Sequence, residues 1–229
     1  MPLYVVATPI GNLADITLRA IETLKSSDII LCEDTRHTIK LLNHYNIKAN
    51  RLVSFYAQNE KSRIDNIIRI LKENKVISLV SDGGTPCISD PGYHLINECY
   101  DNNIEVFSIP GPSAVISAIS ICGFSADTFL FYGFLPRKEG KIKKVLQTLQ
   151  TVDGLVVIYE SCYRIKSTLN IIKEIYGSST EIFIARELTK KFEEKFKGKV
   201  VEILEKISDK IRGEFVIIIN LYKNKNNVK

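Results

Sequence analysis

The 229-residue sequence lacks the features that would place it in a membrane or in a disulfide-rich secreted class. No apolar run approaches the roughly 18 residues that a membrane-spanning helix needs. The first residues form no basic region followed by a small-residue cleavage site, so we interpret them as a strand and expect a cytoplasmic protein with no membrane partner. The five cysteines form no C-x-x-C pair, and we expect reduced thiols with neither a disulfide framework nor a zinc site.

Common nucleotide and metal motifs are also missing. No G-x-G-x-x-G follows the first apolar segment, and no G-x-x-x-x-G-K-[ST] occurs anywhere. These absences argue against a standard dinucleotide site and a P-loop NTPase. The three histidines stand alone without metal-ligand spacing, so no metal is expected; for His44 and His94 we favour packing or surface roles.

What the chain does contain is an alternation of short apolar runs with amphipathic segments, which is typical of an α/β protein. The apolar strands of the first half indicate a largely parallel, buried sheet. Asp15 is a candidate cap for the first helix. We predict strands over residues 3–8, 29–32, 76–80, 104–109, 128–132, 155–159, 181–185 and 214–222, and helices over 15–26, 62–73, 90–102, 141–150, 164–176 and 200–207.

Charge is distributed unevenly along the chain. Residues 1–124 carry 11 Lys/Arg and 13 Asp/Glu (11 − 13 = −2), whereas residues 125–229 carry 20 and 13 (20 − 13 = +7). A basic second half suits a polyanionic partner, although a solvated lysine surface would look the same. Together with the break at residues 123–125, this shift predicts an N-terminal α/β domain over 1–124 and a basic C-terminal α/β domain over 125–229, with a ligand cleft between them.

Three loops rich in glycine and proline follow strands of the first half, over residues 7–12, 81–92 and 110–114. In open α/β sheets the ligand crevice lies beyond the carboxyl ends of the strands, where these loops should gather. Glycine lets the backbone approach a ligand closely, and backbone N–H groups in such turns can bind a carboxylate. The alternative is that the loops are only tight turns between strands and helices.

The ordered motifs of the chain resemble those of the ribosomal RNA small subunit methyltransferase I family. The similarity extends from residue 3 to about residue 222 and is carried by residues 8–13, 33–36, 81–86, 90–92, 110–114, 133–136, 160–161, 164, 185–190 and 213–214. It implies the two-domain α/β tetrapyrrole-methylase fold, the cofactor S-adenosylmethionine between the domains, and a homodimer. It also implies methylation of a cytidine ribose 2′-hydroxyl in the decoding region of small ribosomal subunit RNA.

Cofactor residues follow from the same resemblance, position by position. The chain departs from the family at Gly83, where alanine is common, and at Cys162 and Tyr163, where a proline and a histidine are common; a histidine base at position 163 is therefore excluded. The implied cofactor residues are Ile10, Ser81, Asp82, Gly83, Gly84, Thr85, Pro86, Ile88, Pro110, Ser113 and Ala114, with Tyr159, Leu188, Gly213 and Glu214 from the second domain.

A ribose hydroxyl is a weak acid, so its methylation calls for a general base. A desolvated carboxylate near the cofactor would serve best, and the candidates are Glu33, Asp34, Glu160 and Glu187. The sequence does not choose among them. The segments that hold them could instead be structural turns with internal ion pairs.

RNA contacts are expected from cations that gather in a few segments. Phosphate contacts would make the affinity salt-dependent, and the 2′-hydroxyl marks the substrate as RNA. The candidates are Arg36, His37, Lys40, Arg137, Lys138, Lys141, Lys143, Lys144, Arg164, Arg186 and Lys190. Two other functions stay open: a methyltransferase for a small tetrapyrrole, and a non-catalytic RNA-binding protein of ribosome assembly.

Overall fold

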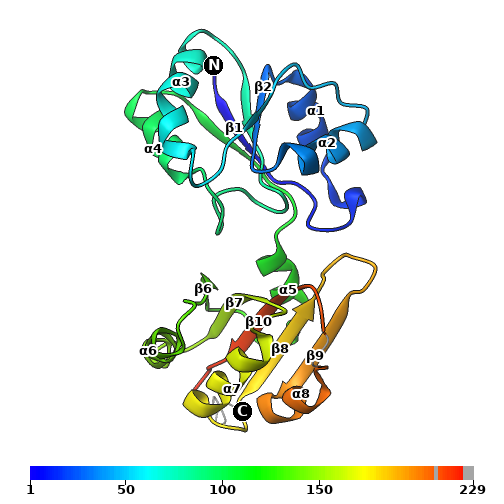
Figure 1. Cartoon of the computed structure of the whole chain (residues 1–229), viewed down its shortest axis with the longest axis vertical. Coiled ribbons are helices and arrows are strands. Elements are labelled where there is room, and N and C mark those ends of the chain that lie inside the picture. Colours follow the sequence, from blue (N-terminus) through cyan, green and yellow to red (C-terminus); the bar gives the residue numbers. More distant parts are fainter. Residues whose placement is uncertain (209–210, 224–229) are drawn as a thin grey trace. The chain divides into compact units, whose positions relative to one another are not determined.

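The chain folds into two compact α/β units, Met1–Ser113 and Ala114–Lys229 (Figure 1). The computed structural model describes residues 1–208 and 211–223. Within these residues, no helix is both long enough and apolar enough to cross a membrane.

The first unit is built on a five-stranded sheet in the order β3-β2-β4-β1-β5, in which every neighbouring pair is parallel. Leu3 pairs with Ile77 on one side and with Val106 on the other. The predicted parallel, buried sheet is confirmed. The strands are β1 (Leu3–Val6), β2 (Ile29–Cys32), β3 (Leu52–Ser54), β4 (Ile77–Leu79) and β5 (Val106–Ile109).

Helices cover both faces of this sheet. One core cluster joins residues of β2 and β4 to α3 and α4, and another joins β1 and β2 to α1 and α2. Figure 1 shows the two helix pairs on opposite sides of the strands. The helices are a short 3-10 turn η1 (Leu13–Asp15), α1 (Leu18–Ser26), α2 (Thr35–His44), α3 (Glu60–Lys72) and α4 (Tyr93–Asp101).

The start of the first helix differs from the prediction. Asp15 was expected to cap it, but Asp15 ends η1, whose own cap is the Asn12 side chain. The side-chain oxygen of Thr17 instead accepts a hydrogen bond from the N–H of Ala20 and caps α1. At the N-cap position, a threonine hydroxyl accepts the hydrogen bond of this free N–H as an aspartate carboxylate would.

The second unit contains a mixed sheet in the order β6-β7-β10-β8-β9, parallel only between β6 and β7. A large apolar cluster joins this sheet to α6, α7 and α8, while α5 packs against β8 and β10. The elements are α5 (Ala114–Cys122), β6 (Phe129–Phe134), α6 (Glu139–Leu149), β7 (Leu155–Ser161), α7 (Ile165–Tyr176), β8 (Glu181–Arg186), β9 (Glu194–Lys199), α8 (Val200–Lys206) and β10 (Glu214–Asn220).

The division of the chain differs from the boundary expected near residue 124, because α5 is grouped with the second unit. Residues 114–124 carry no charged side chain, so the charge contrast between the two parts is unchanged. Five elements were not predicted: η1, α2, β3, α5 and β9.

Gly92 shows how tightly the 81–92 loop is built. Its φ is +133°, and a Cβ placed there would lie 2.6 Å from Cys87 Sγ and 2.7 Å from Leu79 Cδ2. Its N–H donates to the carboxylate of the buried Glu60 at 3.1 Å. The position therefore combines backbone strain with lack of space for any side chain.

Gly92→Ala should lower the free energy of unfolding by roughly 2–4 kcal/mol, because the strain and the overpacking add. Gly140→Ala is the matched control, since Gly140 lies in α6 and its Cβ would meet nothing within 4 Å. Urea denaturation followed by circular dichroism measures both. Equal stability of the two variants would contradict the account of the loop.

Candidate functional site

Two of the glycine-proline loops are joined directly at the carboxyl edge of the first sheet. The N–H of Thr8 donates to the carbonyl of Gly84, and the N–H of Gly84 donates to the carbonyl of Thr8, both at 2.9 Å. The Thr8 hydroxyl also donates to the carbonyl of Ser81 at 3.3 Å. The loops after β1 and β4 thus form one rigid piece of backbone.

The loop after β5 is attached to the same piece. The Thr85 hydroxyl donates to the carbonyl of Pro112 at 3.2 Å. Gly111 packs so closely that an added Cβ would lie 3.1 Å from the Cβ of Ala7. The structure therefore brings together the three loops that the sequence singled out. They carry Ile10, Ser81, Asp82, Gly83, Gly84, Thr85, Pro86, Ile88, Pro110 and Ser113, whereas Ala114 begins α5.

Gly84 adopts a left-handed backbone conformation that favours glycine. Its φ is +91°, and a Cβ there would lie 3.4 Å from Ile10 Cγ2 and 3.8 Å from the carbonyl of Pro112. A side chain at this position would be strained and would project between the three loops. Glycine therefore keeps the surface where the loops meet free of side-chain atoms.

Ser81 holds an unsatisfied polar atom at the base of this loop. The residue is 5% exposed, and its Oγ makes no hydrogen bond of ordinary geometry with any described residue. It lies near Asp90, whose pKa is raised by burial, and its contact with that carboxyl offsets only part of the rise. A buried hydroxyl without a good partner costs free energy, so it marks a place where a polar ligand atom would be favoured.

Glu33 directly follows β2 and belongs to a group of acidic residues at this edge. Burial raises its pKa first, and the nearby carboxylates of Asp90, Asp82 and Asp34 raise it further. The Asp82 carboxylate is held in place because its Oδ1 accepts the N–H of Asp34 at 3.0 Å. A half-buried carboxylate with a raised pKa is the form in which a general base is most effective.

Asp34 follows Glu33 in the chain, but its surroundings lower its pKa where those of Glu33 raise it. Hydrogen bonds from the Arg36 side chain and backbone lower the pKa of Asp34 to about 2. Its carboxylate also caps α2 through the N–H of Arg36 at 2.8 Å. This environment makes Asp34 a weak base and explains the residue as a helix cap.

Asp90 was not among the predicted site residues. It is half-buried, burial raises its pKa, and its charge acts on Glu33. Ser89 before it has a φ of +68°, which fixes an unusual turn. The signal in the sequence was the segment Ser89-Asp90-Pro91-Gly92, which was noted for its glycine and proline and not for its carboxylate.

In the second unit, Glu160 is buried in a network of hydrogen bonds. Its side chain has no exposed surface; Oε1 accepts from the N–H of Ser161 at 2.7 Å and from Arg164 Nε at 2.8 Å, and Oε2 accepts from Thr168 Oγ1 at 2.7 Å. Arg164 also donates to the carbonyls of Leu135 and Pro136. This geometry favours a structural pair over the catalytic and RNA-binding roles expected of Glu160 and Arg164.

Glu187 and Glu214 share one cation at the edge of the second sheet. Lys190 Nζ lies 3.0 Å from Glu187 Oε1 and 2.8 Å from Glu214 Oε2. Burial would raise the pKa of Glu187, but the N–H of Glu214 and the Lys190 ammonium outweigh it and lower the pKa. Gly213 fits here because an added Cβ would lie 2.5 Å from Glu187 Cγ. Leu188 is buried beside them.

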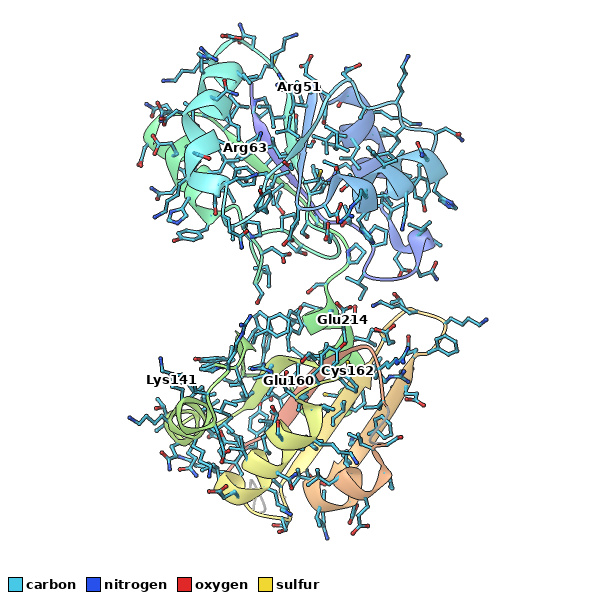
Figure 2. The ribbon with its side chains drawn as sticks, in the orientation of Figure 1. Arg51, Arg63, Lys141, Glu160, Cys162 and Glu214 are labelled. Atoms are coloured by element: carbon cyan, nitrogen blue, oxygen red, sulfur yellow. The ribbon has the colours of Figure 1, made fainter. Side chains whose placement is uncertain are left out.

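The cations predicted to bind RNA divide into two groups. Lys143 bridges Glu139 and Glu174, and Arg186 pairs with Glu194 at 2.6 Å, so both charges are offset internally. Lys141 projects from α6 (Figure 2) and is exposed. The other exposed predicted cations are His37, Lys40, Arg137, Lys138 and Lys144. Arg36 is exposed too, but its guanidinium pairs with Asp34 at 2.7 Å.

Comparison with known proteins identifies the family. The family model for Tetrapyrrole (Corrin/Porphyrin) Methylases matches residues 2–204. The ribosomal RNA small subunit methyltransferase I of Thermotoga maritima is 48% identical, covering 95% of this chain and 97% of its own length. The protein of the same name from Escherichia coli O157:H7 is 42% identical, covering 96% and 78%.

Solved structures agree on the fold. The methyltransferase CobJ matches with a TM-score of 0.71 and 16% identity, covering 100% of this chain and 97% of its own. A uroporphyrin-III C-methyltransferase from Thermus thermophilus, complexed with S-adenosylhomocysteine, matches with a TM-score of 0.68 and 14% identity, covering 96% and 98%. The predicted fold class is confirmed, and the chain belongs to the ribosomal RNA small subunit methyltransferase I family within the tetrapyrrole methylases.

Proposed function

We propose that this chain transfers a methyl group from S-adenosylmethionine to the ribose 2′-hydroxyl of a cytidine in the decoding region of small-subunit ribosomal RNA. Methylation of ribosomal RNA with this donor follows from the family. The observation that carries the proposal further is the joined set of three loops beside Glu33, at the carboxyl edge of a parallel sheet.

The residues at this edge fit the cofactor. The buried Ser81 Oγ has capacity for a polar ligand atom, and Gly84 leaves the loop surface free of side-chain atoms. Ser81, the 82–86 loop and Ser113 would hold the cofactor. When bound, S-adenosylmethionine supplies a methyl group on a positively charged sulfur. The acidic group of Glu33, Asp82 and Asp90 gives this edge a negative potential, which favours a cation.

The chain's own residues would then position the ribose and accept its proton. Glu33 Oε would take the proton of the 2′-hydroxyl as the oxygen attacks, because its raised pKa makes it a stronger base than an ordinary glutamate. Holding the reacting groups in line contributes as well, in favourable cases about 7–11 kcal/mol. Tyr159, Leu188, Gly213 and Glu214 remain proposed cofactor contacts from the second unit.

Two earlier expectations also remain proposals: that the protein forms a homodimer and that it works in the cytoplasm. The exposed cations of the second unit support RNA binding, since they leave positive charge available for phosphate. The tetrapyrrole alternative is the competing function that an experiment has to exclude.

Transfer of a labelled methyl group from S-adenosylmethionine tests the proposal. The purified protein should label small-subunit RNA, presented free or in the assembled subunit, and should leave uroporphyrinogen unlabelled. Labelling of the tetrapyrrole alone would contradict the proposal. No detectable binding of S-adenosylmethionine, with neither acceptor labelled, would favour the assembly-factor alternative.

Gly84→Ala should weaken binding of S-adenosylmethionine at least tenfold, because the added Cβ strains the loop and projects between Ile10 and Pro112. Isothermal titration calorimetry measures the dissociation constant. Gly140→Ala, in a helix of the second unit, is the control and should bind like the wild type. An unchanged affinity of the Gly84 variant would place the cofactor elsewhere.

A further inference from the structure

Three aromatic rings gather on two neighbouring strands of the second sheet. The ring centroid of Tyr159 on β7 lies 4.9 Å from that of Phe131 and 5.5 Å from that of Phe134, both on β6. The interplanar angles of 67° and 59° are those of edge-to-face and tilted contacts. The rings therefore support one another.

An irregularity in β6 produces this arrangement. Phe131 pairs with Val157, Gly133 with Ile158 and Phe134 with Tyr159, so Tyr132 is an extra residue in the ladder. Without it, two residues three positions apart would point to opposite faces of the sheet. Because of the bulge, and the Gly133 φ of +82°, both phenylalanines lie on the face of Tyr159.

One of the three rings is accessible. Phe134 is 57% exposed, whereas Phe131 and Tyr159 are partly buried, and β6 is the edge strand of its sheet. The neighbouring Ile158 points to the other face, where it belongs to the core under α6, α7 and α8. An exposed aromatic ring offers a flat apolar face on which a planar group of a ligand can stack.

Positive charge follows these rings immediately along the chain. Arg137, Lys138 and Lys141 are exposed, and none of their side chains forms an ion pair with a residue in the described ranges 1–208 and 211–223. Lys143 differs, because Glu139 and Glu174 hold its ammonium at 3.0 and 2.9 Å. The cations nearest to Phe134 are thus the ones whose charge is available.

The segment that links the rings to the cations is held rigidly. Arg164 Nη1 donates to the carbonyl of Leu135 at 3.1 Å and to that of Pro136 at 3.0 Å. The fully buried Glu160 carboxylate fixes the same guanidinium at 2.8 Å. The backbone between Phe134 and Arg137 is therefore held in place before any ligand binds, which reduces the entropy lost on binding.

We propose that Phe134, Arg137 and Lys138 bind one unpaired nucleotide of the RNA substrate, its base stacked on the Phe134 ring and its phosphates on the two cations. An exposed ring followed by free cations matches the chemistry of single-stranded RNA, whose bases are splayed out and stacked on aromatic side chains. A purely apolar partner would leave the cations unused. The inference rests on the proposed function, because it assumes an RNA substrate.

The test compares three variants under steady-state methylation of small-subunit RNA. Phe134→Ala should raise KM for RNA roughly 5- to 150-fold, the range that loss of one stacked base produces. Phe134→Tyr should restore most of the affinity, since it keeps the ring. Tyr100→Ala is the matched control: Tyr100 is 63% exposed on α4 and lies beside Asp101. It should behave like the wild type.

Calorimetry with S-adenosylmethionine separates the outcomes. The proposal expects Phe134→Ala to bind the cofactor like the wild type, and Arg137→Ala to reduce the salt dependence of RNA binding by about one phosphate contact. An unchanged KM for Phe134→Ala, or a loss of cofactor affinity in its place, would overturn the nucleotide site while leaving the proposed function intact. A wild-type protein that methylates no RNA would overturn both.

Discussion

Glu33→Gln lowers the turnover number for methyl transfer by about 10²–10³-fold and leaves the affinity for S-adenosylmethionine nearly unchanged, if Glu33 is the base. The substitution keeps the shape of the side chain and removes its ability to accept a proton. Burial, and then the charges of Asp90, Asp82 and Asp34, raise the pKa of Glu33, whereas the pKa values of the candidates Asp34 and Glu187 are lowered. Single-turnover kinetics with small-subunit RNA measure the effect.

The pH dependence of the wild type follows with a definite sign. A general base works in its ionised form, so activity is lost as pH falls through the pKa of Glu33. Because that pKa is raised above its usual 4.5, the loss begins at a higher pH than for an ordinary glutamate. Removing the nearby charge with Asp90→Asn should lower the pKa and move the acid limb of the profile to lower pH.

Asp34→Asn provides the control for Glu33. Its carboxylate has a pKa of about 2 and serves as the cap of α2, which asparagine can also provide. We expect a change in turnover of less than tenfold. A larger loss in Asp34→Asn than in Glu33→Gln would show that Asp34, and not Glu33, accepts the proton.

Arg164→Ala is expected to lower the free energy of unfolding of the second unit by about 3–5 kcal/mol, because it leaves the buried charge of Glu160 without its partner. The Glu160 side chain has no exposed surface while Arg164 is in place. The carbonyls of Leu135 and Pro136 lose their donors as well. Urea denaturation, followed by circular dichroism, gives the midpoint and slope.

Lys143→Ala is the matched control for Arg164. It also breaks contacts with carboxylates, but Glu139 and Glu174 are 68% and 56% exposed, and exposed pairs contribute about 0–1 kcal/mol. We expect the two variants to differ by more than 2 kcal/mol. Similar losses would show that Glu160 is hydrated in solution and that the pair is not the anchor of the 133–138 segment.

Most of the fold could be predicted because the spacing of apolar residues along the chain indicates which face of a helix or strand is buried. β2 was predicted at its observed bounds, and α7 within one residue, since both present clear apolar patterns. α5 was missed because Ala114–Cys122 is apolar on every side and shows no stripe. β9 was missed because Glu194–Lys199 is mostly charged and becomes a strand only by pairing with β8 at the sheet edge.

The gathering of the three glycine- and proline-rich loops could be predicted as well, because the carboxyl ends of parallel strands meet at one edge. The choice among the carboxylates could not. Glu33 is distinguished by Asp90, far away in sequence, and Asp34 by its contact with Arg36. The interactions of Lys143 and Arg164 were equally hidden, because Glu174 and the carbonyl of Leu135 become neighbours only after folding.

The identity of the methylated nucleoside tests the central claim most directly. Small-subunit RNA is incubated with the purified protein and S-adenosylmethionine, digested to nucleosides and analysed by mass spectrometry. The account predicts 2′-O-methylcytidine, formed by the wild type and strongly reduced with Glu33→Gln. A methyl group on a base, or product formation that Glu33→Gln leaves unchanged, would contradict it.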